Sequence, residues 1–142
     1  ILYKVRLANN DLGSGMSLHG FVMVGLGAAI GAWFRWLLAL MFNGNLMAFP
    51  VGTLLANLIG SYFMGLLMAL FTFTPSISAE TRLFLITGLL GGLTTFSSFS
   101  GEAMTLLTKG QYAWAGTHIA LHVVGSLAMT GLGLLTVHML RS

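Results

Sequence analysis

Residues 88–102 read Gly-Leu-Leu-Gly-Gly-Leu-Thr-Thr-Phe-Ser-Ser-Phe-Ser-Gly-Glu and lie within a mostly apolar stretch over about 79–107. Two adjacent glycines followed by two β-branched threonines are poor helix formers. As one continuous helix the stretch would measure about 45 Å, against a bilayer hydrocarbon core of roughly 30 Å. A break between Gly91 and Thr95 accounts for both observations. The alternative is a continuous tilted helix whose glycines serve packing.

Three more apolar stretches flank this one, over about 18–42, 51–73 and 112–140. Each supplies the roughly 20 residues that a membrane-spanning helix needs. Turn-forming residues separate the stretches at 43–45, 74–76 and 109–111, and the period-two alternation of strands is absent. The sequence therefore predicts an all-α membrane protein with four transmembrane helices, the third of them broken in mid-membrane.

The composition agrees with a lipid-covered protein. Of 142 residues, 56% are hydrophobic and 6% are charged, whereas a soluble domain is typically about a quarter charged. The formal charge of +3 comes from scattered basic residues, which do not form the clustered patch of a nucleic-acid-binding protein. Cysteine is absent, so disulfides and cysteine-ligated metals are excluded.

The first fifteen residues differ from the rest, since they carry charged side chains and end in Gly13-Ser14-Gly15 before Met16. We interpret 1–15 as an N-terminal extension or tag and 16–142 as the transmembrane domain. The alternative is a native amphipathic arm.

Basic residues are balanced across the predicted spans. From Met16 onward, Arg82 and Arg141 fall on one side of the membrane, and Lys109 and Arg35 fall on the other. The positive-inside rule then gives no preferred orientation. The chain could insert both ways and pair antiparallel with itself, or one orientation could win through small effects. Glycines along the helices favour close packing and an oligomer.

Unwound backbone at membrane depth is tolerated only inside protein or beside a water-filled cavity, where its carbonyls can coordinate a cation. Phe96 and Phe99 follow the predicted break at i, i+3, with Ser97 between them. Such phenylalanines usually face lipid or the core. The alternative is that their positive ring edges face an anion, which the surrounding serines and threonines make plausible.

Polar side chains also recur every fourth residue on two other helices, as Thr53, Asn57 and Ser61, and as His118, His122, Ser126 and Thr130. Polar groups within spans mark permeation routes or act as hydrogen-bonding glue between helices. Both interpretations stay open here.

Arg35 and Glu102 are charges placed within or at the ends of spans. Arg35 could snorkel to the interface or hold an anion at a vestibule, and the scarcity of acids favours an anion as cargo. A serine hydrolase is not expected, because no nucleophile elbow accompanies the serines and histidines.

Four motifs together resemble the signature of the CrcB/Fluc fluoride channels. The likeness covers about 21–140. Its motifs are Gly27-x-x-x-Gly31 with Arg35-Trp36, Gly52-Thr53-Leu54-x-x-Asn57-x-x-Gly60, the run from Gly91 to Glu102, and Gly125-Ser126-x-x-Met129-Thr130.

The resemblance implies an antiparallel homodimer with two fluoride pathways at the subunit interface. Phe96 and Phe99 would form an aromatic box around fluoride, Asn57 would donate a hydrogen bond in the pore, and Ser126 and Thr130 would form a polar track. The resemblance also implies a structural Na⁺ on the two-fold axis, held by the backbone carbonyls of Gly91 and Thr94 from both subunits. The roles of His118 and His122 are not covered by these motifs.

We therefore expect a non-enzymatic, fluoride-selective channel of a bacterial-type plasma (inner) membrane. It would export cytoplasmic fluoride passively and so lower fluoride toxicity. The alternatives are a small dual-topology proton-coupled multidrug or cation antiporter, which would need a carboxylate midway along the first helix, and a non-transporting scaffold.

Overall fold

The structure of the chain, a computed structural model, describes residues 17–43 and 50–141. The predicted extension 1–15 lies outside the described residues. Within the described part the chain is all-helical, without strands. Its helices are α1 (Leu18–Phe42), α2 (Val51–Phe73), α3 (Ala79–Arg82), η1 (Leu83–Leu90), α4 (Gly91–Leu93), α5 (Phe96–Thr108) and α6 (Tyr112–Arg141).

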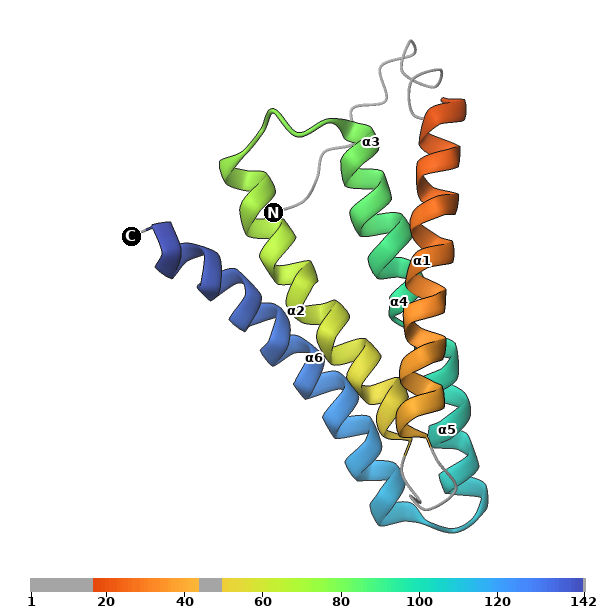
Figure 1. Cartoon of the computed structure of the whole chain (residues 1–142). Helices are drawn as coiled ribbons and strands as arrows, with labels where there is room; N and C mark the ends of the chain where they lie inside the picture. The colour runs from red at the N-terminus through yellow and green to blue at the C-terminus, as the bar shows by residue number, and fades with distance from the viewer. Residues whose placement is uncertain (1–16, 44–49, 142) are drawn as a thin grey trace, which may run out of the picture.

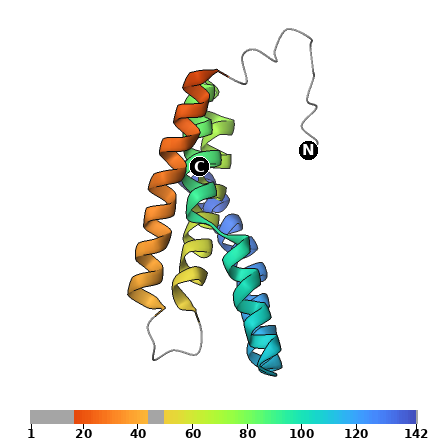
Figure 2. The same cartoon turned by 90° about the vertical axis from the view of Figure 1, so that its right-hand side faces the viewer.

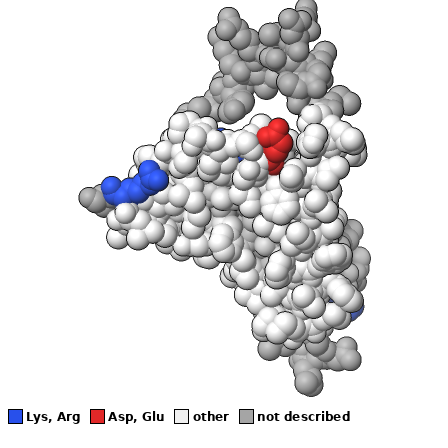
Figure 3. Space-filling view, turned by 45° about the horizontal axis from the view of Figure 1, so that its top comes forward, with Lys and Arg blue, Asp and Glu red and all other residues white. Residues whose placement is uncertain are grey.

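Four stretches of these helices are long and apolar enough to cross a membrane, which confirms the predicted count of spans. α1, α2 and α6 each form one span. The helices α3, η1, α4 and α5 join to form the remaining span, Ala79–Thr108, which is the third along the chain. Many large apolar side chains are exposed on the surface of the described helices, and Figure 3 shows a face with few charges. Such an apolar surface is suited to lipid.

Two layers of helices make up the molecule (Figure 1). α1 lies along η1 and α4, whereas α2 lies along α6. α5 leaves the first layer and packs against the N-terminal part of α6. A small core of Ala56, Leu90 and Leu93 lies where the layers meet.

Glycines allow the close approach within each layer, as the sequence predicts. A Cβ on Gly133 of α6 would meet the Tyr62 carbonyl oxygen and come within 2.7 Å of the Leu66 nitrogen on α2. A Cβ on Gly31 of α1 would come within 2.7 Å of the Leu93 nitrogen on α4. Backbones in direct contact are the usual means of helix association in lipid.

The third span changes its winding twice. η1 is π-helical, and the Gly91 N–H that follows it bonds back to the Ile86 carbonyl. α4 then ends at Leu93, because Thr94 and Thr95 are extended, with ψ angles of 153° and 115°. α5 begins at Phe96, capped by the Thr95 hydroxyl, which accepts from the Ser98 N–H at 3.1 Å. Figure 2 shows the chain changing direction at this point.

Candidate functional site

A cavity of about 350 Å³ opens beside the two extended residues, between α2, α5 and α6. Its lining combines hydroxyl, amide and imidazole groups with two phenyl rings. The residues are Asn57, Gly60, Ser61, Met64, Thr94, Thr95, Phe96, Phe99, His122, Val123, Ser126 and Thr130. The structure thus brings together the polar stripes of α2 and α6 with the phenylalanine pair of α5.

Asn57 of α2 forms hydrogen bonds both to the extended residue Thr95 and to His122 of α6. Its Oδ1 accepts from the Thr95 N–H at 2.7 Å, and its Nδ2 donates to the Thr95 carbonyl at 3.1 Å. These two bonds fix the orientation of the amide, so its second N–H is the one directed at His122 Nδ1, 3.0 Å away. Asn57 therefore supplies the hydrogen bonds that Thr95 would otherwise make within a helix.

The same bonds select the tautomer of His122. Because the Asn57 amide can only donate at this position, His122 Nδ1 acts as the acceptor, and a neutral His122 ring carries its proton on Nε2. His122 is 4% exposed, and Nε2 is buried without a hydrogen-bond partner among the described residues. The site thus contains a buried N–H donor whose partner is not a described protein group.

Phe99 is enclosed by the two histidines of α6. Its ring centroid lies 5.4 Å from that of His118 and 4.7 Å from that of His122. Phe96 meets Phe99 edge to face at 5.4 Å, but it is 78% exposed where Phe99 is 8% exposed. Both rings line the cavity, but the Phe99 ring is packed inside the chain and the Phe96 ring lies on its surface.

Ser126 and Thr130 line the cavity from α6, and their hydroxyls behave differently. The Thr130 hydroxyl lies within bonding distance of the Ser61 carbonyl of α2 at 3.2 Å and of its own helix at Ser126, 3.0 Å away. This is the interhelical glue that the sequence left as an option. The Ser126 hydroxyl makes no hydrogen bond to the described residues, so its donor can serve a ligand.

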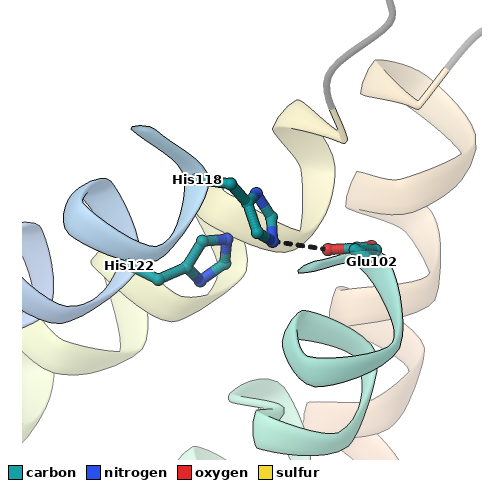
Figure 4. A group of neighbouring side chains, drawn as sticks. All are labelled: Glu102, His118 and His122. Atoms are coloured by element: carbon teal, nitrogen blue, oxygen red, sulfur yellow. Dashed lines mark ion pairs between the residues drawn. The ribbon is translucent and has the colours of Figure 1, made fainter. Parts of the chain in front are cut away.

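A second cavity, of about 520 Å³, lies at the other end of α5 and is lined by Pro50, Ser98, Gly101, Glu102, Thr105, Leu106, Lys109 and Gln111. Glu102 is held at the edge of this cavity, because the Thr53 hydroxyl donates a hydrogen bond to Glu102 Oε1 at 2.5 Å. The other oxygen, Oε2, lies 3.5 Å from His118 Nε2 (Figure 4). Glu102 and the histidines thus stand between the two cavities.

Residues 22–134 match the family described as CrcB-like protein, Camphor Resistance (CrcB). The chain belongs to this family. It is 55% identical over 119 residues to a protein of Pseudomonas putida (strain W619), with 84% of this chain and 94% of the relative covered. It is 48% identical over 123 residues to a protein of Pseudomonas syringae pv. maculicola, with coverages of 87% and 97%. Both relatives are named "Fluoride-specific ion channel FluC".

Membership of the CrcB family, together with the four apolar spans, makes this chain a multi-pass membrane protein. The family match also confirms the membership that the four sequence motifs indicated.

Three of the predicted pathway residues, Thr53, Ser97 and Arg35, line neither cavity of this CrcB protein. The Ser97 hydroxyl lies 3.2 Å from the Thr95 hydroxyl and is exposed. Arg35 of α1 donates from Nε to the Gly92 carbonyl at 3.0 Å. Arg35 therefore ties α1 to the C-terminal end of α4, and its guanidinium charge compensates a carbonyl that has no helical partner.

The carbonyls near the bend include the two predicted for a cation. The Leu90 carbonyl accepts from Thr94, and the Thr95 carbonyl accepts from Asn57. Neither the Gly91 nor the Thr94 carbonyl accepts any of the side-chain or interhelical hydrogen bonds found among the described residues near the bend. Carbonyl oxygens suit a hard cation, but two oxygens from one chain are too few to enclose it.

The histidines are the site residues to which the sequence assigned no role. Their i, i+4 spacing placed both on one face of a helix, and this was the available signal. What the sequence did not show is the neighbourhood: His118 is fully buried against Phe99, and His122 is bonded to Asn57.

Proposed function

We propose that this CrcB protein is a fluoride-selective channel that lets cytoplasmic fluoride leave the cell passively through the inner membrane. The observation that carries the proposal is the cavity beside Thr94 and Thr95, where hydroxyl and imidazole donors gather around phenyl rings. Relatives that align with most of the chain are named as fluoride-specific channels. The protein is a channel rather than an enzyme.

Fluoride is small and strongly hydrated, so a narrow pore has to replace its water with other donors. The Ser126 hydroxyl and the His122 Nε2–H are donors of this kind, and the edges of Phe96 and Phe99 add weak positive potential. Several weak sites in series let the ion leave as well as enter. A negative-inside potential drives an anion outward by about 2.3 kcal/mol per 100 mV.

Glu102 acts on the entry of fluoride into the pathway and does not coordinate the ion. A carboxylate repels fluoride unless a proton or a donor neutralises it. The Thr53 hydroxyl and His118 both lie against Glu102. We assign this group to the mouth of the pathway, where the second cavity also exposes Lys109, a cation that attracts anions.

The functional unit is an antiparallel homodimer in this proposal, with the bend of the third span lying within the bilayer. The cavity opens to the side of a single chain, and Phe96 is 78% exposed there. Polar backbone and hydroxyls at membrane depth cannot face lipid, so a second copy has to cover them. The balance of basic residues permits two copies of opposite orientation.

A structural Na⁺ fits the same arrangement. The Gly91 and Thr94 carbonyls of two copies would supply an uncharged oxygen cage on the two-fold axis. The bound cation would neutralise the carbonyl dipoles at the bend, and would hold the two copies together.

Fluoride efflux from liposomes containing the purified protein tests the function. A membrane potential set by potassium and valinomycin should drive fluoride out, at a rate that does not depend on a proton gradient. Efflux that requires a proton gradient would favour the antiporter. An absence of fluoride efflux from protein that is folded and reconstituted would remove the proposal.

A further inference from the structure

Three metal-ligating side chains converge between α5 and α6. Glu102 comes from α5, and His118 and His122 come from successive turns of α6 (Figure 4). One potential ligand atom of each lies within 4.8 Å of the others. The two imidazoles are almost completely buried, at 0% and 4% exposure, and the carboxylate is 23% exposed.

The donor set points to a transition metal rather than to Na⁺ or Mg²⁺. Two imidazole nitrogens and one carboxylate oxygen are the ligands of open zinc sites, whose fourth position holds water. Hard cations take oxygen ligands instead. An anion is disfavoured at the centre of the three because one member is itself a carboxylate.

A neighbouring group orients one of these ligands, as in metal sites where an outer hydrogen bond fixes a ligand of the ion. The Thr53 hydroxyl binds Glu102 Oε1, which leaves Oε2 facing the histidines. Oε2 is buried without a hydrogen-bond partner among the described residues. A buried carboxylate oxygen of this kind calls for an additional partner such as a cation.

An ion has a way in, because Glu102 lines the second cavity and His122 lines the first. We propose that Glu102, His118 and His122 form a binding site for a transition-metal ion such as Zn²⁺, and that an ion bound there obstructs passage between the two cavities. The metal site stands independently of fluoride transport, whereas the obstruction rests on the proposed function.

Metal binding requires a rearrangement that the structure specifies. Ligands of one tetrahedral zinc lie roughly 3.4 Å apart, given bond lengths near 2.0–2.1 Å, so the side chains close in by small rotations. Ligation through His122 Nε2 needs the tautomer with its proton on Nδ1. That proton would face the Asn57 amide N–H, so the Asn57–His122 bond breaks. Zn²⁺ therefore disturbs the residue that holds Thr95.

Isothermal titration calorimetry of the purified full chain with ZnCl₂ in detergent tests the site directly. His118→Gln and His122→Gln should each weaken Zn²⁺ binding by about tenfold or more. His138→Gln is the matched control, since His138 is an exposed histidine of the same helix outside the cluster; it should bind Zn²⁺ like the parent. Equal binding by the parent and both cluster variants, or loss of binding in the control, would overturn the site.

X-ray absorption at the zinc edge keeps the test independent of folding in the variants. The parent protein with one equivalent of Zn²⁺ should show imidazole scattering and only nitrogen and oxygen neighbours. A spectrum of hydrated zinc would contradict the proposal.

Fluoride efflux then separates the two parts of the inference. Zn²⁺ should slow efflux in the parent, EDTA should restore it, and His118→Gln should need about tenfold more Zn²⁺ for the same effect. Zn²⁺ binding to the cluster with unaltered efflux would keep the site and reject the obstruction. Binding in a protein that passes no fluoride at all would reject the proposed function while the site stands.

Discussion

At the scale of single residues, the site depends on Asn57. Its amide completes the hydrogen bonds of Thr95 on one side and fixes the tautomer of His122 on the other. Both N–H groups of Asn57 are engaged in the structure. Asn57 therefore acts first as a clamp on the extended backbone, and it can donate to a passing ion only by releasing a partner.

Asn57→Asp tests the clamp. The substitution replaces the N–H donors by a carboxylate that faces the Thr95 carbonyl and His122 Nδ1, and it places negative charge beside the anion path. We expect a loss of about 1–3 kcal/mol in the free energy of unfolding and strongly reduced fluoride efflux. Thermal unfolding and liposome efflux measure the two effects, and unchanged values for both would place Asn57 outside the site.

Phe96→Ile and Phe99→Ile should separate stability from transport. Both remove an aromatic edge from the cavity, so both should abolish efflux while leaving the dimer intact. Phe99 is packed between histidines, so its replacement should also lower the free energy of unfolding by about 1–3 kcal/mol. Replacement of the exposed Phe96 should lower the free energy of unfolding of a single chain by less. Size-exclusion chromatography and thermal unfolding serve as controls. Normal efflux in either variant would refute the aromatic assignment.

At the scale of helices, the glycines decide how closely the spans pack. Gly133 and Gly131 form a natural pair for comparison on α6. A Cβ at Gly133 would strike the α2 backbone, while a Cβ at Gly131 would meet nothing within 4 Å.

Gly133→Ala should destabilise the protein by about 1–3 kcal/mol through overpacking. Gly131→Ala should be neutral or slightly stabilising, because alanine is the better helix former by about 1 kcal/mol. Unfolding in a denaturing detergent measures both. Equal stability of the two variants would contradict the packing of α2 on α6.

The helices also show what the sequence could and could not predict. The four spans follow from apolar runs and turn residues, because burial in lipid is governed by composition. The glycines and threonines at 91–95 predicted a break in the third span, and Thr94 and Thr95 are extended. The π-helical winding of η1 has no local signature in Leu83–Leu90. The clamp on Thr95 joins residues 38 positions apart, and the histidine cluster needs a carboxylate from another helix, so neither could be read from local spacing.

At the scale of the whole molecule, the charges at the two ends of the spans bear on orientation. Arg82 and Arg141 lie at one end of the described helices, with Lys109 at the other and Arg35 in the half of α1 that leads toward it. This balance underlies the proposed pairing of copies in opposite orientations.

The orientation can be measured with single cysteines, because the chain has none of its own. Ser76→Cys and Gln111→Cys mark exposed positions at opposite ends of the molecule. In intact spheroplasts an impermeant maleimide should label about half of each variant, since a chain without charge bias inserts both ways. Complete labelling of one variant and none of the other would show a single orientation.

In the proposed function, the cavity beside Thr94 and Thr95 carries fluoride passively and selectively. The most direct measurement is voltage-driven efflux from liposomes loaded with both fluoride and chloride, followed by ion-selective electrodes. Fluoride should leave rapidly without a proton gradient, while chloride should be retained. Retention of fluoride, or equal loss of both anions, would contradict it.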